Sequence, residues 1–328
     1  MKPVRWGILG AAKFARQFMG PAIHAAHGAE LTALATSSEE KAAGFQAFCP
    51  TLKVYTDYDA LLADPNIEAV YIPLPNHMHV DWTVKALEAG KHVLCEKPIA
   101  LENSDFDRLI AARDTSGKLA AEAFMIVHHP QWQHARDLVQ SGEIGALRHI
   151  SGRFSFDNRE DTTNIRNRPE TGGGGLRDIG VYVMGSTRFV TGLEGSDVSA
   201  RVRWENGVDV FADISASFGD ATYSAYVSTR MQPAQEMVFH GEKGLIRMVT
   251  PFNARVFGEA VVELHRTGHV GGGSVHAQRF PMDDHYKLQV EAFGRSVRDG
   301  ADYLCPLEFS RGTQIMMDRV FEVATDLG

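Results

Sequence analysis

The sequence predicts a doubly wound parallel α/β domain followed by an α+β domain built on a large, mostly antiparallel open sheet. Three observations support this fold class. Short apolar strands alternate with helices over the first 125 residues, strands of alternating polarity between Gly, Asp and Asn turns dominate the rest, and 328 residues suit two domains. We therefore expect one domain at 1–125 and a second at 126–328.

In the first half, each strand is a short apolar run without alternation, which is typical of a parallel sheet buried on both faces. The helices end at stop signals such as Gly90 and Gly117. The expected strands are 4–9, 30–36, 53–55, 69–72, 92–95 and 119–125. The expected helices are 14–26, 39–48, 57–62, 81–89 and 105–116.

In the second half, polar and apolar residues alternate within the strands, and turns such as Glu205-Asn206-Gly207 separate them. Such a sheet has one face solvated or covered. Because a large open sheet would expose apolar surface unless it is paired, we expect a homo-oligomer, first of all a dimer, built through this sheet. The expected strands are 148–156, 198–204, 208–218, 222–229 and 236–241, and the expected helices are 131–141, 180–191, 286–298 and 310–324.

Composition narrows the class of protein. The formal charge of -8 argues against a nucleic-acid or anionic-membrane partner, because either normally requires a basic face. No apolar run reaches the ~18 residues of a membrane span. The cysteines Cys49, Cys95 and Cys305 form no C-x-x-C pair, so we expect reduced thiols in a cytoplasmic protein, without disulfides or a thiolate metal site.

The first strand leads into a turn that is typical of dinucleotide binding. It reads Gly10-Ala11-Ala12-Lys13-Phe14-Ala15. The G-x-G-x-x-G/A fingerprint falls on Gly10, Ala12 and Ala15, with alanine in place of the second glycine. The helix N-terminus that follows offers N–H groups to phosphates. We predict a nicotinamide dinucleotide here; the alternative is a plain turn whose small residues serve packing.

The end of the second strand indicates which cofactor is bound. An NAD site usually places an acid there for the ribose 2′-hydroxyl, whereas this chain offers Ser37-Ser38 and no acid before Glu39. Hydroxyl and N–H groups can bind a 2′-phosphate, and Lys13 or Lys41 could lie nearby. The sequence therefore favours NADP, with NAD possible.

The strand 92–95 is followed by Glu96-Lys97-Pro98, at the carboxyl end of a parallel strand, where ligands bind in open α/β folds. A lysine in this place can hydrogen-bond both nicotinamide and a substrate oxygen. Glu96 could orient the ammonium group, and Pro98 favours an extended backbone at Lys97.

The preceding loop, Leu74-Pro75-Asn76, is held extended by proline, and we expect these residues and His79 to line the nicotinamide pocket. The spacing of His77 and His79 could also suggest a metal site. No carboxylate or cysteine is placed to complete such a site, so we predict no metal.

A glycine run, Gly172 to Gly175, precedes the next pair of candidates, Asp178 and Tyr182. Their spacing of four places both on one face at the start of a helix. Hydride delivery to a carbonyl leaves an alkoxide that needs a proton, and Tyr182 is the expected acid/base because a nearby lysine favours phenolate. Lys97 would polarise the substrate oxygen, and Asp178 would orient substrate hydroxyls or the lysine.

Together these motifs resemble the glucose–fructose oxidoreductase, inositol dehydrogenase and rhizopine-catabolism family over essentially the whole chain. The matching features are the G-x-A-x-x-A turn, P-N-x-x-H, E-K-P, the stretch Asn164-Ile165-Arg166 and G-G-G-L-R-D-I-G-V-Y. The resemblance implies a Rossmann domain, and that Lys97, Asp178 and Tyr182 face the nicotinamide. Tyrosine in place of histidine resembles the branch with sugar dehydrogenases and dimeric dihydrodiol dehydrogenase.

Within that resemblance, Arg166 is a candidate for contact with substrate oxygens or a carboxylate, or else for a surface ion pair. We expect hydride transfer between nicotinamide and a small sugar, polyol or diol. Two alternatives stay open. One is glycoside hydrolysis or elimination with no net redox change, which the same residues could serve. The other is a cofactor-sensing regulatory protein, which would have no need of Lys97 and Tyr182.

Overall fold

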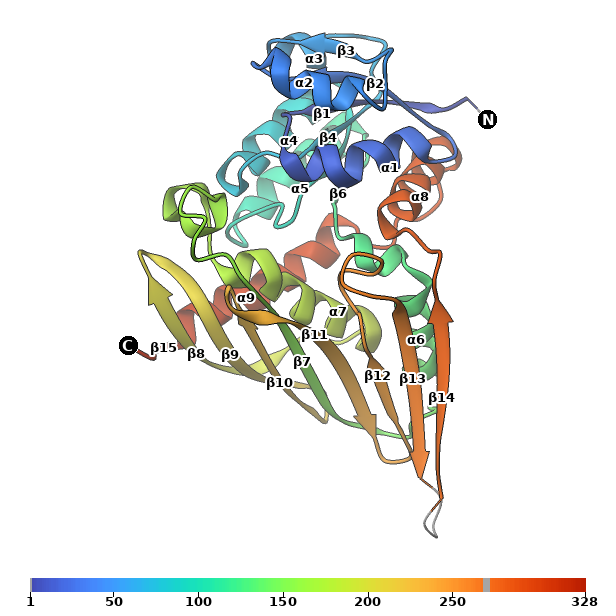
Figure 1. Ribbon diagram of the computed structural model, residues 1–328, viewed down its shortest axis with the longest axis vertical. Coiled ribbons are helices and arrows are strands. Elements are labelled where there is room, and N and C mark those ends of the chain that lie inside the picture. The colour runs from blue at the N-terminus through green and yellow to red at the C-terminus, as the bar shows by residue number, and fades with distance from the viewer. Residues whose placement is uncertain (1, 268–271) are drawn as a thin grey trace. The chain divides into compact units, whose positions relative to one another are not determined.

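The computed structural model describes residues 2–267 and 272–328, and these divide into two compact units (Figure 1). The first unit comprises residues 1–125 and 285–311, and the second comprises residues 126–284 and 312–328. The division at residue 125 coincides with the expected boundary. Residues 285–311, which we expected in the second domain, fold with the first unit.

The first unit is a six-stranded parallel sheet with strand order β3-β2-β1-β4-β5-β6, as expected for a doubly wound fold. The strands are β1 Val4–Leu9, β2 Ala29–Ala35, β3 Lys53–Tyr55, β4 Ala69–Ile72, β5 His92–Cys95 and β6 Ala120–Glu122. The helices are α1 Gly20–Ala25, preceded by a π-helical turn at Ala15–Met19, α2 Glu39–Gln46, α3 Tyr58–Leu62, α4 His79–Glu88, α5 Asp105–Ser116 and α8 His285–Asp299.

Both faces of this sheet are covered, as its apolar strands require. On one face, Leu9 belongs to an apolar cluster with Leu61 of α3, Leu87 of α4 and Leu109 of α5. On the other, Trp6 packs on Phe293 of α8, with 5.0 Å between ring centroids. Helix α8 therefore supplies part of the first unit's core, which explains why the chain returns to this unit after residue 284.

The second unit is built on a nine-stranded sheet with strand order β14-β13-β12-β11-β7-β10-β9-β8-β15. Its strands are β7 Leu147–Asp157, β8 Ser196–Glu205, β9 Val208–Phe218, β10 Ala221–Ser228, β11 Arg230–Gly241, β12 Leu245–Met248, β13 Ala260–Thr267, β14 Gly273–Phe280 and β15 Ala324–Asp326. The helices are α6 Pro130–Gln140, α7 Val181–Thr191 and α9 Leu307–Val323, whose first residues belong to the first unit.

This sheet is mostly antiparallel, which confirms the expected fold class. The central pair β7 and β10 is parallel, however, and so is the edge pair β15 and β8. The strands β12 to β15 were not expected from the sequence. Residues 273–279 of β14 are exposed on both faces, so this strand carries no alternation that would reveal it.

One face of the nine-stranded sheet packs against helices, and the opposite face is open and polar. Phe154 points toward Tyr182 of α7, whereas the neighbouring Arg153 lies on the open face and pairs with Glu236 at 3.0 Å. Glu236 and Glu263 both pair with Arg247. Ion pairs thus cross this face where we expected exposed apolar surface.

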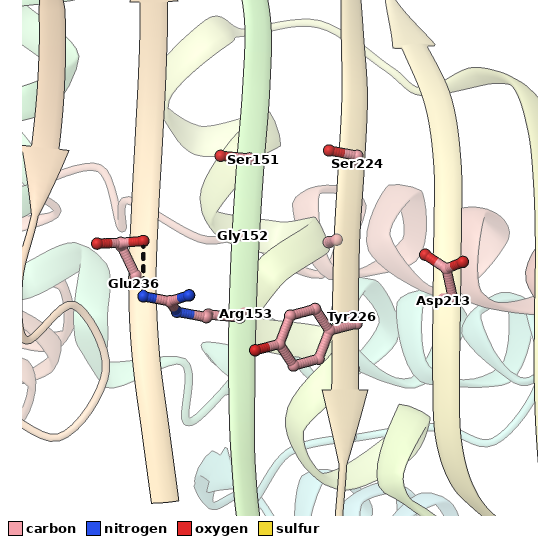
Figure 2. Close-up of a pocket in the computed structure, with 8 residues that line it drawn as sticks. Ser151, Gly152, Arg153, Asp213, Ser224, Tyr226 and Glu236 are labelled. Atoms are coloured by element: carbon pink, nitrogen blue, oxygen red, sulfur yellow. Dashed lines mark ion pairs between the residues drawn. The ribbon is translucent and has the colours of Figure 1, made fainter.

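Figure 2 shows a pocket of about 210 Å³ on the open face, and its lining is rich in serine and charged side chains. It is lined by Ser151, Gly152, Arg153, Asp213, Ser224, Ala225, Tyr226 and Glu236. Serines and paired charges thus lie on this side together with the Tyr226 ring, which stacks on Phe211. A homo-oligomer built through this sheet stays a prediction.

Candidate active site

The turn after β1 has the shape that a dinucleotide requires. Gly10 has φ +101°, which strains any residue with a side chain. Its N–H donates to the Ala35 carbonyl at 2.9 Å, and a Cβ at Gly10 would lie 2.9 Å from Cδ2 of Leu74. The helix then begins, because the N–H of Arg16 donates to the carbonyl of Ala12 at 3.0 Å.

The side chains beyond Gly10 leave the backbone of the turn accessible. Ala11, Ala12 and Phe14 are partly buried, and Lys13 is exposed. First-turn N–H groups have no partner within a helix and attract anions. The turn thus fits the pyrophosphate of a nicotinamide dinucleotide, and the extra methyl of Ala12 is not sealed inside the core.

After β2, the two serines have different surroundings. Ser38 caps α2, because its hydroxyl accepts a hydrogen bond from the Lys41 N–H at 3.2 Å. Ser37 is exposed. Of the pair, Ser37 is therefore the hydroxyl that is better placed for a 2′-phosphate.

His79 lies behind the two candidate loops. Its side chain is fully buried, and its Nδ1 and Nε2 each lie 2.7 Å from a main-chain oxygen, those of Pro98 and Leu74. Burial lowers the pKa of His79. With both ring nitrogens directed at these carbonyls, His79 links the Leu74-Pro75-Asn76 loop to the Lys97-Pro98 turn and leaves the lining of the pocket to Pro75 and Asn76, which are partly exposed.

Glu96 is held by hydrogen bonds on both carboxylate oxygens. The Tyr71 hydroxyl donates to Oε1 at 2.6 Å, and the Lys97 N–H donates to Oε2 at 3.2 Å. Burial and the neighbouring carboxylate raise the pKa of Tyr71 well above its usual value, so it stays a donor. Glu96 therefore orders the main chain at Lys97, which is partly buried and precedes a cis peptide bond to Pro98.

Glu122 is a buried carboxylate near this turn, and sequence reasoning missed its role. It is 4% exposed and accepts a hydrogen bond from the Ile99 N–H at 2.9 Å. Burial raises the pKa of Glu122. Its signal in the sequence was a carboxylate at the end of the short apolar strand 120–122.

In the second unit, Asp178 and Tyr182 stand at the start of one long helix. A π-helical turn, Leu176–Gly180, carries Asp178 and runs directly into α7, which carries Tyr182. The two residues are 8% and 6% exposed. π-Helical turns within helices are frequent at functional sites.

Arg166 and Asp178 are brought together by the fold. The Arg166 Nε lies 2.6 Å from Oδ2 of Asp178, and the arginine side chain is 36% exposed. Asn164 positions this arginine, because its Oδ1 accepts from the Arg166 N–H at 3.1 Å. Arg166 is therefore an ion-pair partner of a candidate catalytic residue, and its side chain is partly exposed.

Tyr182 packs among aromatic rings. Its ring centroid lies 5.6 Å from that of Phe154 and 5.5 Å from that of Phe252, and these two phenylalanines stack on each other at 4.9 Å. Such packing restricts the tyrosine side chain to one orientation.

Two family models match parts of both units of the chain. Residues 4–124 match the model described as "Oxidoreductase family, NAD-binding Rossmann fold", and residues 132–247 match the GFO/IDH/MocA C-terminal domain. The chain belongs to the Gfo/Idh/MocA oxidoreductase family. This confirms the expected family, and with it a nicotinamide-dependent oxidoreductase acting on CH–OH or keto groups of a polyhydroxylated substrate.

Similar proteins extend over nearly the full length. The dTDP-3,4-didehydro-2,6-dideoxy-alpha-D-glucose 3-reductase of Saccharopolyspora spinosa is 37% identical over 304 residues, covering 91% of this chain and 89% of that protein. D-xylose 1-dehydrogenase (NADP(+)) 2 of Haloferax volcanii is 30% identical, covering 97% of each. KijD10, a 3-ketoreductase from Actinomadura kijaniata solved with NADP and TDP-benzene, is 29% identical with a TM-score of 0.89, covering 99% of each chain.

The glycine run allows two segments of the main chain to pack closely against each other. A Cβ at Gly173 would lie 2.7 Å from the carbonyl oxygens of Ile165, Arg166 and Arg168. The N–H of Gly174 donates to the Arg166 carbonyl at 2.9 Å. Gly173 therefore permits close approach of the segment that carries Arg166.

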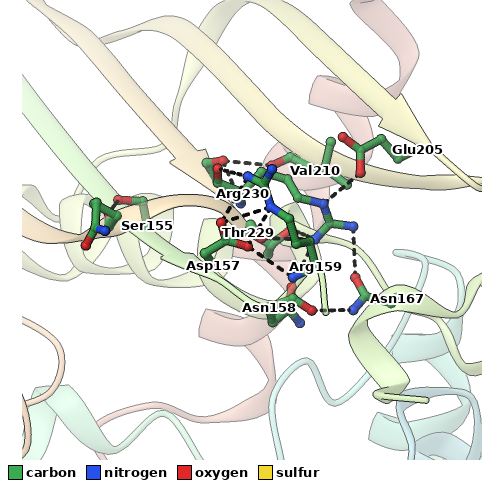
Figure 3. Close-up of polar contacts among 11 residues, drawn as sticks. Ser155, Asp157, Asn158, Arg159, Asn167, Glu205, Val210, Thr229 and Arg230 are labelled. Atoms are coloured by element: carbon green, nitrogen blue, oxygen red, sulfur yellow. Dashed lines mark hydrogen bonds and ion pairs between the residues drawn. The ribbon is translucent and has the colours of Figure 1, made fainter. Parts of the chain in front are cut away.

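Arg230 holds that segment on the sheet, a role that no motif in the sequence indicates. Figure 3 shows its guanidinium among three side chains: it donates to Glu205 at 2.7 Å, to Asn158 Oδ1 at 3.0 Å and to Asn167 Oδ1 at 3.0 Å. Asn158 and Asn167 flank the turns that lead to Arg166. Arg230 therefore orders the loop that places Arg166 beside Asp178.

Asp209 is a further buried carboxylate that sequence reasoning missed. It is 2% exposed, and its Oδ2 accepts a hydrogen bond from the Leu176 N–H at 2.6 Å. Burial raises the pKa of Asp209 to about 6, against the lowering effects of the Leu176 hydrogen bond and the charge of Arg177. The sequence feature that could have revealed this role is a carboxylate between Val208 and Val210 in an apolar strand.

Residues 2–267 and 272–328 contain no group of three or more His, Cys, Asp or Glu side chains arranged to hold a metal ion. Over the same ranges, none of the helices has the length and apolar character needed to cross a bilayer.

Replacing Arg230 with methionine should loosen the loop 158–171. Three hydrogen bonds to Glu205, Asn158 and Asn167 would be lost from a side chain that is 13% exposed, at a net loss of about 1–3 kcal/mol in local stability. We expect trypsin to cleave after Arg159 and Arg166 about tenfold faster, measured by mass spectrometry. Arg201→Met, which removes an exposed ion pair with Asp213, is the control; equal cleavage in both variants would contradict the role of Arg230.

Asp209 should make stability depend on pH. The pKa of Asp209 is about 6 in the folded protein and 3.8 in the unfolded chain. Between pH 3.8 and about 6, the folded protein therefore retains a proton that the unfolded chain has released. The associated stability is complete below the unfolded pKa and is lost as pH rises through about 6. Relative to Asp209→Asn, wild type should lose about 2 kcal/mol of unfolding free energy between pH ~4.5 and ~7.5 in urea titrations. A difference that is constant or grows with pH would refute this.

Proposed function

We propose that this protein interconverts a keto group and a hydroxyl group of a sugar with NADP(H), and that Lys97, Asp178 and Tyr182 surround the reacting carbon. The observation that carries the assignment is the buried Asp178, ion-paired with Arg166 and placed four residues before Tyr182 at the start of a helix. A carboxylate and a phenol held in this way can orient a hydroxyl and exchange its proton.

The preference for NADP is supported by the end of β2. Ser37 is exposed there, Ser38 is engaged as a cap, and the first acids, Glu39 and Glu40, lie within helix α2. The solved structure of KijD10 holds NADP, and the name of the Haloferax relative specifies NADP. When bound, the nicotinamide supplies or accepts the hydride.

The substrate class is supported by the relatives and by Arg166. Several relatives are dTDP-sugar 3-reductases, and one is a D-xylose dehydrogenase. The partly exposed guanidinium of Arg166 can donate to sugar oxygens while Asp178 accepts from a sugar hydroxyl. We infer a sugar, free or nucleotide-linked, as the substrate.

The protein groups then divide the proton chemistry. During reduction, the Tyr182 hydroxyl donates its proton to the oxygen that becomes the alcohol, and during oxidation it accepts that proton. The Lys97 ammonium stabilises negative charge on the same oxygen, and its main chain is held by Glu96. Asp178 orients the substrate hydroxyl, and the ion pair with Arg166 holds that carboxylate in place.

Tyr182→Phe and Lys97→Ala should each lower kcat/KM by about 10²–10⁴-fold, because each removes a group that acts on the reacting oxygen. Nicotinamide absorbance, followed with a panel of aldoses, keto sugars, inositols, diols and dTDP-sugars, is the measurement. Tyr226→Phe on the open face of the sheet is the matched control.

Full turnover in Tyr182→Phe would remove the assignment of the acid/base. Co-purified nicotinamide without net turnover of any alcohol or ketone would replace the redox assignment with glycoside cleavage, which aryl glycosides then test.

Ser37→Asp should disfavour NADP. A carboxylate at this exposed position repels a 2′-phosphate and can accept a hydrogen bond from a 2′-hydroxyl, so kcat/KM should fall by at least about tenfold with NADP and less with NAD. Thr51→Asp makes the same change at another exposed position. Equal losses with both cofactors would show that Ser37 does not contact the 2′-phosphate.

A further inference from the structure

We propose that Asp209 is a positioning residue for the reaction, because its carboxylate fixes the start of the helix that carries Asp178 and Tyr182. The proposal rests on the proposed function of those two residues. Asp209 itself lies on β9, a different element, and it reaches the helix across a large separation in sequence.

A β-bulge turns Asp209 toward the helix. Trp204 of β8 pairs with Asp209 and Arg203 pairs with Phe211, so Val210 is an extra residue in β9. Regular alternation would place Asp209 on the same face as Asp213, which lies on the open face and pairs with Arg201. The bulge instead directs Asp209 to the covered face, where it is 2% exposed.

The carboxylate then meets main-chain donors at the helix start. The Leu176 N–H donates to Oδ2 at 2.6 Å, and a backbone hydrogen bond from Gly175 also acts on the carboxylate. These N–H groups belong to the first turn, where a helix offers unsatisfied donors and a positive dipole end. A buried carboxylate without such partners would be strongly destabilising, so the charge is matched to this location.

The glycine run is shaped around this carboxylate. A Cβ at Gly174 would overlap Oδ1 of Asp209 and lie 3.1 Å from its Cγ, and Gly174 has φ +117°. A Cβ at Gly175 would lie 3.3 Å from Oδ2. Asp209 therefore occupies the space that these glycines leave.

From this anchor, the candidate catalytic groups follow at short range. The Asp178 N–H donates to the carbonyl of Gly174 at 3.2 Å, and Leu176 is two residues before Asp178. Tyr182 follows one turn later on the same continuous helix. A shift of the helix start would move both side chains relative to the substrate, and displacements of about 1 Å can lower rates about 10²-fold.

The test uses the full-length protein with Asp209→Asn and Asp209→Ala, and Asp213→Asn as the matched control from the same strand. kcat, KM for the sugar and for NADPH, and the NADPH dissociation constant are measured, together with hydrogen–deuterium exchange of residues 176–182. We expect kcat to fall about 10-fold to 100-fold, with the alanine variant slower than the asparagine variant. NADPH binding should stay within about twofold of wild type, and exchange should speed up at residues 176–182 but not at residues 211–218.

The proposal would be overturned if the Asp209 variants kept the wild-type kcat and showed unchanged exchange at residues 176–182. It would also be overturned if their affinity for NADPH fell by as large a factor as their kcat. Failure of the proposed function has a different signature, namely full turnover in Tyr182→Phe or no sugar turnover by wild type. In the second case exchange alone decides, because unchanged protection in Asp209→Asn excludes an anchor at Leu176 and faster exchange supports it.

Discussion

Hydrogen bonds between buried side chains and the main chain of loops and helix starts are the constraint on which the candidate site depends. His79, Glu96, Glu122 and Asp209 each contact a backbone group within the segments that carry the site. A buried polar group that lost its hydrogen-bond partner would destabilise the fold. Each of these contacts therefore favours the one loop conformation in which the hydrogen bond forms. The loops are thereby held in place by residues that need not touch a substrate.

The two units use this constraint in different ways. In the parallel sheet of the first unit, the loops at the carboxyl ends of β1, β2, β4 and β5 carry the candidate cofactor residues, and side chains within the unit order them. In the second unit, one helix carries Asp178 and Tyr182, and its start is held by the glycine run, the Arg166 segment and β9. The sheet supplies the rigid base from which Asp209 reaches that helix and Arg230 reaches the loop that carries Arg166.

On the open face of the nine-stranded sheet, the alternation of polar and apolar residues identifies a side outside the core but does not reveal which contacts its side chains make. Alternation correctly indicates that one side of β7, β9 and β10 is not in the core. The residues on that side include serines and paired charges, such as Arg153 with Glu236, and also the Tyr226 ring stacked on Phe211.

Local periodicity was sufficient to identify most elements. The strands 53–55, 69–72, 92–95 and 208–218 have the bounds that were expected, because a run of apolar residues between turn signals is a local property. The residue types at Gly10, Lys97, Asp178 and Tyr182 were also recognisable in advance, since motif spacing is local too. The strands β12 to β15 and the return of residues 285–311 were not, because they are stabilised by pairing and packing with distant segments.

By itself, the sequence determined the fold class and indicated a candidate nicotinamide-binding turn and the residue types of the candidate site. Only the tertiary structure decided which buried groups hold that site. Asp209 illustrates the physical reason: alternation in β9 predicts that it shares a face with Asp213, and a bulge formed by pairing with β8 turns it inward to meet Leu176. Partners that are far apart in sequence are chosen by three-dimensional geometry, which no local pattern records.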